Sequence, residues 1–174
     1  MNWYVLQVVT GMEWEAAETI RKNGIAASVP AENRLIRTKG HWIEREYLLF
    51  PGYLFVELDY TVDTWHLLTA VPGVIRILGA GNGAPVPLTD QEAEWVAFLG
   101  ECLLKPSHIQ ADGNGGWQVT GGALLRLQDK IIRVYPRRRR AVVRLTFAGQ
   151  TLHIPFSAYF HGANAFQGQS LFVG

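Results

Sequence analysis

The sequence predicts two domains: an α+β amino-terminal domain, in which helices flank an antiparallel sheet, followed by a small all-β barrel. Segments of helical and strand periodicity alternate up to residue 104, whereas no helical pattern follows residue 116. The charge divides in a similar way. Residues 1–100 hold 7 Lys and Arg against 12 Asp and Glu, and residues 101–174 hold 9 against 3, so a net charge of −5 is followed by one of +6. This division indicates two modules with different partners.

The first module is expected to run β-α-β-β-β-α-β-α. In its first helix Trp14, Ala17 and Ile20 recur at helical spacing. The candidate N-caps are Thr61 or Asp63 for the second helix and Thr89, in a capping box with Glu92, for the third. The expected elements are strand 3–9, helix 12–24, strands within 27–59 around a hairpin tip at Thr38–His41, helix 61–71, strand 73–79 and helix 88–104.

Residues 105–116, "KPSHIQADGNGG", are rich in Gly, Pro and polar side chains and lack periodicity, so we expect a linker. Behind it, "IIRVY", "AVVRLTF" and "TLHIPF" are short strands with turns at 136–140 and 148–149, which predicts a small barrel. The predicted domains are therefore 1–104 and 117–174, on either side of the linker.

The strand over residues 53–58 has an unusual outer face. Successive side chains alternate, so Leu54 and its even-numbered neighbours point into the core, while Tyr53, Phe55 and Glu57 point away from it. Two large aromatic rings on a strand face that also carries a carboxylate would be exposed to water unless another part of the chain or a partner buries them. Either a helix of the same domain covers them, or the face is a docking surface for another protein, where aromatic side chains serve as anchors.

The sequence carries no signature of catalysis. It has no His-Glu-x-x-His helix, phosphate-binding glycine loop or elbow serine, and Cys102 is its single cysteine. The glycine-rich stretch 79–85 leads to Pro85 and Pro87 rather than to a helix start, so it is expected to be a loop. The chain is predicted to be neither an enzyme nor a cofactor- or metal-binding protein. It lacks the roughly 20 apolar residues of a membrane helix and a signal-peptide pattern, which favours the cytoplasm.

Four segments of the first module resemble the NusG family of bacterial transcription elongation factors: "WYVLQVVTGMEWEAA", "LLFPGYLFVELD", "TWHLLTAVPGVIRILG" and "PLTDQEAEWV". They occur in that family's order and spacing over residues 2–100. The resemblance implies the family's NGN-like first domain. In the family this domain grips a coiled coil on the clamp, in the largest subunit of RNA polymerase.

Carried over to this sequence, the resemblance implies a polymerase-binding surface of aromatic residues and the proline beside them. Its members are expected to be Tyr4, Phe50, Pro51, Tyr53 and Phe55, with Trp3 and Trp65 as further candidates that could equally be core residues. Upstream or non-template DNA is a further candidate partner. The residues before the second Pro-Gly are Thr69, Ala70 and Val71 here, which argues against sequence-specific DNA contact.

The second module resembles the family's KOW barrel over residues 119–149. Gly122, Ile131 and Gly149 match, whereas Ala123 replaces the usual proline and Asp129 replaces the signature glycine. The "RRRR" run at 137–140 is most similar to the specialised LoaP-type paralogues, which are antiterminators of large operons. We therefore expect a monomeric antitermination factor that acts at the nucleoid through RNA polymerase.

From residue 117 onward there are 8 Lys and Arg against one acid. So many positive charges around the arginine run indicate a negatively charged partner. Arginine binds phosphate through planar donors and stacks on exposed bases, so nascent RNA, in a hairpin, is the expected partner. A solvated charged turn and a ribosome-associated or general RNA-binding KOW protein are the alternatives. The candidate RNA-binding residues are Arg137, Arg138, Arg139, Arg140, Arg133, Arg144, Lys130 and Arg126.

Overall fold

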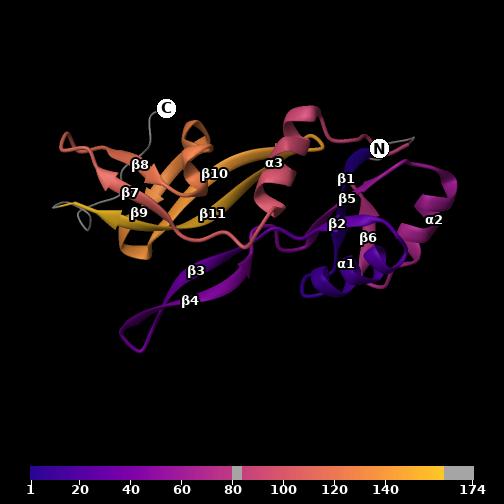
Figure 1. Cartoon of the computed structure of the whole chain (residues 1–174), viewed down its shortest axis with the longest axis horizontal. Helices are drawn as coiled ribbons and strands as arrows, with labels where there is room; N and C mark the ends of the chain where they lie inside the picture. Colours follow the sequence, from indigo (N-terminus) through magenta and orange to yellow (C-terminus); the bar gives the residue numbers. More distant parts are fainter. Residues whose placement is uncertain (80–83, 163–174) are drawn as a thin grey trace. The chain divides into compact units, whose positions relative to one another are not determined.

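The computed structural model describes residues 1–79 and 84–162, which form two compact units interleaved along the chain (Figure 1). The first unit consists of Met1–Pro30, Phe50–Cys102 and Thr146–Gln150; the second consists of Ala31–Leu49, Leu103–Leu145 and the described residues from Thr151 on. Residues 80–83 of the expected glycine-rich loop and residues 163–174 of the expected barrel lie outside the described residues.

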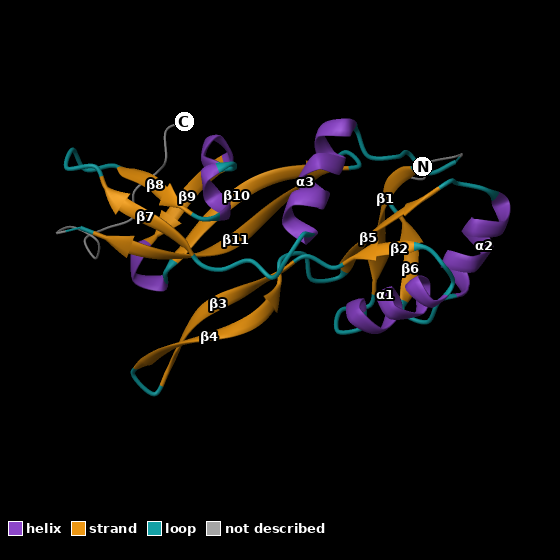
Figure 2. Cartoon of the chain, viewed as in Figure 1, coloured by secondary structure: helices purple, strands orange, loops and turns teal. Residues whose placement is uncertain are grey.

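The first unit is an α+β structure built on a four-stranded sheet of order β2-β5-β1-β6 (Figure 2). Strand β1 pairs antiparallel with β5, with Tyr4 opposite Val56, and with β6 on its other side. The strands are β1 (Asn2–Val8), β2 (Ala26–Ser28), β5 (Tyr53–Leu58) and β6 (Val74–Ile77), and the helices are α1 (Glu13–Lys22), α2 (Val62–Ala70) and α3 (Asp90–Gly100). The α+β prediction for this part is confirmed.

The helices begin at the residues that their capping signals indicate. At α2, Thr61 rather than Asp63 is the N-cap, and its hydroxyl oxygen accepts a hydrogen bond from the Thr64 amide at 3.1 Å. At α3 the predicted box is complete: Thr89 Oγ1 accepts from the Glu92 amide at 3.2 Å, and Glu92 Oε2 accepts from the Thr89 amide at 2.8 Å. Both boxes satisfy backbone donors that the first helical turn leaves unpaired.

The buried face of helix α1 differs slightly from the face that the spacing of its apolar residues predicts. Ala17 and Ile20 are buried as the periodicity indicates, but the Trp14 side chain is 46% exposed and Glu13 is only 2% exposed. The Glu13 carboxylate accepts a hydrogen bond from the Gly52 amide at 2.7 Å and another from the Gly11 amide at 2.8 Å. A buried carboxylate needs such donors, so these two bonds turn Glu13 inward.

The second unit contains the β3–β4 hairpin and a five-stranded sheet of order β8-β7-β11-β10-β9. The sheet is the curled β structure predicted for a KOW-like domain, and Figure 1 shows β10 and β11 as one long hairpin. The strands are β3 (Ala31–Thr38), β4 (His41–Leu48), β7 (Ser107–Ala111), β8 (Trp117–Gly121), β9 (Ile131–Tyr135), β10 (Arg140–Phe147) and β11 (Gln150–His161); three 3₁₀ turns are η1 (Ala123–Leu125), η2 (Gln128–Lys130) and η3 (Pro136–Arg138).

The two units do not follow the expected boundary near residue 104. The β3–β4 hairpin belongs to the second unit and the 146–150 turn to the first. Residues 105–116 are also more ordered than a linker, because they contain β7, in which Ser107 and Ile109 are buried. Strand β7 pairs in parallel with β11, about fifty residues away in sequence, with His108 opposite Tyr159. A pairing so distant leaves no signal in a short sequence window.

The Glu13 carboxylate gives a first prediction, for the stability of the first unit. We expect Glu13→Ala to lower the free energy of unfolding by about 1–3 kcal/mol, because the buried Gly52 amide loses its acceptor. Urea titration followed by tryptophan fluorescence measures the change. Glu15→Ala, on the same helix but exposed, is the control and should change the free energy by less than about 0.5 kcal/mol. Equal effects of the two variants would contradict this role of Glu13.

Candidate functional site

Three phenylalanines form a closed aromatic cluster in the first unit. Phe50 precedes the Pro51-Gly52 turn, Phe55 lies on β5, and Phe147 ends β10. Their ring centroids are 5.2 Å (Phe50–Phe55), 5.5 Å (Phe50–Phe147) and 5.3 Å (Phe55–Phe147) apart, with interplanar angles of 62–90°. Such edge-to-face contacts add to the burial of the rings, and all three side chains are at most 3% exposed.

The outer face of β5 is therefore covered by the chain itself, at Phe55 by the 146–150 segment. The 146–150 segment, in which Ala148 and Gly149 turn with φ of 49° and 77°, places Phe147 over Phe55. The neighbouring Tyr53 is half-buried, and its hydroxyl accepts a hydrogen bond from Gln150 Nε2 at 3.0 Å. The alternation of side chains in β5 pointed to Tyr53 and Phe55, but it did not predict that Phe147 covers Phe55. Nothing near Phe147 in the sequence distinguishes it from an ordinary apolar residue at the end of a strand.

The remaining polymerase-binding candidates lie in different environments. Tyr4 is buried in β1 and its ring lies 6.0 Å from that of Tyr60, whereas Trp3 is half-buried. Pro51 is exposed at its turn, and Trp65 is 40% exposed on α2. Of the seven candidates, only Pro51, Tyr53, Trp3 and Trp65 thus present surface in this structure.

The four consecutive arginines occupy the reversal between β9 and β10, and their side chains differ in environment. Pro136 opens the 3₁₀ turn, and Arg139 closes it with a left-handed φ of 53°. Arg137 and Arg138 are exposed. The Arg138 guanidinium lies 5.8 Å from the centre of the Tyr135 ring, and Arg133 donates a hydrogen bond to the Tyr135 hydroxyl at 3.0 Å.

Arg139 stacks on an indole. Its guanidinium carbon lies 4.3 Å from the ring centroid of Trp42, on β4, and 5.9 Å from that of Tyr159, on β11. Cation–π contacts of this kind hold the guanidinium flat and leave its N–H groups at the edge available as donors. This pairing could not be predicted from the sequence, because Trp42 is nearly a hundred residues from Arg139.

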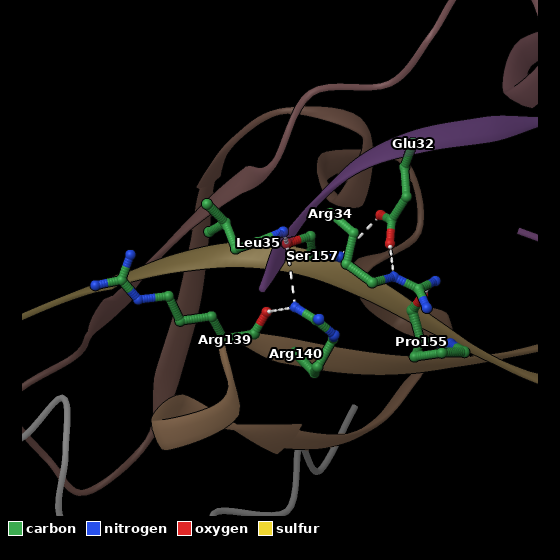
Figure 3. A network of polar contacts seen from close by, with 7 residues as sticks. All are labelled: Glu32, Arg34, Leu35, Arg139, Arg140, Pro155 and Ser157. Carbon is green, nitrogen blue, oxygen red and sulfur yellow. Dashed lines mark hydrogen bonds and ion pairs between the residues drawn. The ribbon is translucent and has the colours of Figure 1, made fainter. Parts of the chain in front are cut away.

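Arg140 belongs to an internal network around a buried carboxylate (Figure 3). Glu32 is 1% exposed, and it accepts hydrogen bonds from the Ser157 amide and from Arg34 Nε, both at 2.8 Å. The Ser157 hydroxyl accepts from the Leu35 amide at 2.8 Å and from Arg140 Nη1 at 3.3 Å. Figure 3 shows the Arg139 side chain extending away from this network. Arg140 therefore has a structural environment, whereas Arg137 and Arg138 face solvent.

Burial dominates the electrostatics of this network. Burial raises the pKa of the Glu32 carboxyl above its ordinary value, although the hydrogen bonds from Ser157 and Arg34 oppose the shift. Burial and the nearby Arg34 charge lower the pKa of Arg140. Two arginines and one carboxylate in a protein interior are stable only because each finds hydrogen-bonding partners.

The other predicted RNA-binding cations lie outside the arginine turn, on η2, after η1 and on β10. Arg126 and Arg144 are exposed, and Lys130 is half-buried with its Nζ 3.6 Å from Asp129 Oδ2. Five of the eight predicted RNA-binding residues are thus exposed arginines: Arg126, Arg133, Arg137, Arg138 and Arg144. Among the described residues no cluster of three His, Cys, Asp or Glu side chains could hold a metal ion, and no helix is long and apolar enough to cross a membrane.

The chain combines an α+β unit that carries a Phe-Pro-Gly-Tyr turn with a basic β unit. Residues 1–96 match the family described as "Transcription termination factor nusG". That match covers more than half of the chain, and the chain belongs to the NusG family.

Named relatives agree with this membership. The chain is similar to the "Transcription termination/antitermination protein NusG" of Buchnera aphidicola subsp. Acyrthosiphon pisum, with 33% identity over 102 residues, 53% of this chain and 56% of that protein. The protein of the same name from Pasteurella multocida is 32% identical over 117 residues, 62% and 64% of the two chains. These matches thus span less than two thirds of either relative's length.

A solved structure shares the fold over most of the chain. It is described as "Domain interaction in Thermotoga maritima NusG" and superimposes with a TM-score of 0.50 and 20% identity, covering 91% of this chain and 93% of that one. At this identity the likeness establishes the fold alone.

The Glu32 network gives a prediction for the pH dependence of stability. Because the folded-state pKa of Glu32 is raised, the native carboxyl holds its proton more tightly than the unfolded one does. Its contribution to stability is then fully present at acid pH and is lost as pH rises through the raised pKa. We expect the free energy of unfolding of the wild type, minus that of Glu32→Gln, to decrease as the pH rises above about 4.5, the ordinary pKa of a glutamate.

Urea unfolding at a series of pH values measures this difference. Glu46→Gln, at an exposed position on β4, is the matched control and should not reproduce the decrease. A difference that is constant, or that grows with pH, would show that the hydrogen bonds to Glu32 outweigh its burial.

Proposed function

We propose that this protein is a transcription elongation and antitermination factor. Its first unit binds the clamp coiled coil of the largest subunit of RNA polymerase, and its basic second unit binds nascent RNA in a hairpin. The protein has no catalytic role and acts at the bacterial nucleoid, in the cytoplasm, through the polymerase. Membership of the NusG family over residues 1–96 is the observation that carries this proposal.

The mechanism follows from differential binding. A factor that holds the clamp closed favours the elongating over the paused state of the polymerase, and preferential binding to one state is sufficient for that shift. The RNA contact then raises the local concentration of the factor on transcripts that carry the hairpin. The exposed arginines of the second unit support this role, because the first unit supplies no comparable excess of positive charge.

The covered aromatic cluster adds a condition to polymerase binding. Phe50 and Phe55 can act as anchors only when Phe147 leaves them, since all three are buried in this structure. Binding through this face therefore requires the 146–150 turn to withdraw. The part of the face that already presents surface, the exposed Pro51 and the half-buried Tyr53, is then the first point of contact.

Retention of bacterial core RNA polymerase by the immobilised full chain tests the polymerase contact. Tyr53→Ala should weaken binding by about 1–3 kcal/mol if Tyr53 is an anchor. Phe147→Ala should strengthen binding, because the cover competes with the polymerase for the same rings. Tyr47→Ala, at a tyrosine on β4 whose side chain is 40% exposed, is the control and should leave retention unchanged. If both Tyr53→Ala and Phe147→Ala bind as the wild type does, this face is not the docking surface.

Salt dependence tests the RNA contact. Each phosphate neutralised contributes roughly −0.7 to −0.9 to the slope of log affinity against log salt, so replacing Arg137 and Arg138 with Gln should flatten the slope by about 1.5. The control is Arg21→Gln with Arg76→Gln, which removes the same charge from exposed positions of the first unit. An equal change in both double variants would indicate only the loss of net charge.

Single-round transcription on a template with pause sites and a terminator tests the activity itself. The protein should raise readthrough without consuming any substrate. Unchanged pausing and termination at saturating protein would rule the proposed function out.

A further inference from the structure

Two histidines of the second unit lie edge to edge in nearly one plane. His108, on β7, and His161, at the end of β11, have ring planes 11° apart and ring centroids separated by 5.3 Å. His108 Nδ1 and His161 Nε2 are 3.0 Å apart. The distance between the two nitrogens, added to the distance from each nitrogen to the centre of its own ring, equals the separation of the ring centroids. The two nitrogens and the two centroids therefore lie on one line. Because the rings are nearly parallel, the hydrogen bond lies in their common plane.

A phenol stacks against one face of His108. Parallel pairing of β7 and β11 places Tyr159 beside His108, with centroids 5.3 Å apart and planes inclined by 24°. The Tyr159 hydroxyl donates a hydrogen bond to Glu44 Oε1 at 2.9 Å, which fixes the ring. On the other side of His108 the partner across β7–β8 is Gly121, which has no side chain to cover the imidazole. Both histidines are exposed and Tyr159 is half-buried.

A cation lies at the end of the same surface. The Arg139 guanidinium is 5.9 Å from the centre of the Tyr159 ring, and its stacking on Trp42 leaves its N–H edge as a donor to phosphate. We infer that His108, His161, Tyr159 and Arg139 form a base platform. It binds an unpaired base of single-stranded RNA on the rings and the adjoining phosphate at Arg139.

This inference rests on the proposed RNA-binding function and specifies which part of the RNA is recognised. Proteins that bind single strands combine a basic groove with flat side chains on which bases stack, and every base has a face to offer. Imidazole rings held by a mutual hydrogen bond and by stacking on Tyr159 lose little conformational freedom on binding. The exposed arginines 137 and 138 attract any polyanion, whereas the base platform distinguishes an unpaired base from a paired one.

Fluorescence anisotropy with the full chain tests the inference, using an oligoadenylate of about ten nucleotides, within the range of known single-strand sites. His108→Ala and Tyr159→Leu should each weaken its binding about tenfold and leave the salt slope unchanged, because no phosphate contact is lost. His153→Ala is the matched control, since it removes another exposed histidine of β11 far from the platform. A 2-aminopurine in the oligonucleotide should be quenched by the wild type and less by the two variants.

An abasic oligonucleotide of the same length separates stacking from charge. It should bind more weakly than oligoadenylate to the wild type, and it should be insensitive to His108→Ala and Tyr159→Leu. If those variants bind oligoadenylate as His153→Ala does, or weaken the abasic strand equally, the base platform is wrong. Tighter binding of oligodeoxyadenylate than of the RNA would overturn the assignment to RNA.

The two proposals can fail separately. If the Arg137 and Arg138 double variant loses RNA while the platform variants do not, the proposed function stands and the base platform falls. If the wild type binds no RNA, neither stands.

Discussion

The second unit depends on one buried carboxylate. Glu32 begins the β3–β4 hairpin and accepts its hydrogen bonds from the Ser157 amide of β11 and from Arg34. Its oxygens thus tie a hairpin to a sheet that is more than a hundred residues further along the chain. The tie also sets the position of β4, and with it the indole on which Arg139 rests. Without an acceptor at this point, Arg34 would remain partly buried with its charge unpaired, which is far more costly than the same charge in water.

The four consecutive arginines at 137–140 have different structural roles, although they are identical in sequence. Four arginines in a row carry the same charge, but a 3₁₀ turn ending in a left-handed residue sends their side chains in separate directions. Arg140 is directed inward to Ser157, Arg139 lies on an aromatic ring, and the first two arginines reach solvent. Local backbone geometry, and not the length of the run, therefore decides how many of these charges are available to a polyanion.

Most of the fold could be predicted from the sequence, and the site only in part. Helices α2 and α3 begin where Thr61 and Thr89 indicate, since capping is a local interaction. The division into an α+β part and a β part follows from periodicity. Strand β7, the burial of Glu13 and Glu32, and the cover that Phe147 provides were not predicted, because each depends on a partner far away in sequence. The arginine run marked the basic surface but could not reveal that Arg140 serves the interior.

The interleaving of the two units limits how this protein can be dissected. A fragment that ends at residue 104 lacks Phe147 and leaves the rings of Phe50 and Phe55 open to water, whereas one that begins at residue 105 lacks both Glu32 and Trp42. Neither fragment contains a complete unit. Measurements on an isolated fragment would therefore reflect its newly exposed rings or its missing carboxylate and indole, and not the properties of the unit in the full chain. A chimaera that joins one part of this chain to part of a relative near residue 104 would also separate residues that pack together. A substitution of the whole chain therefore keeps both units intact, whereas an exchange of one half does not.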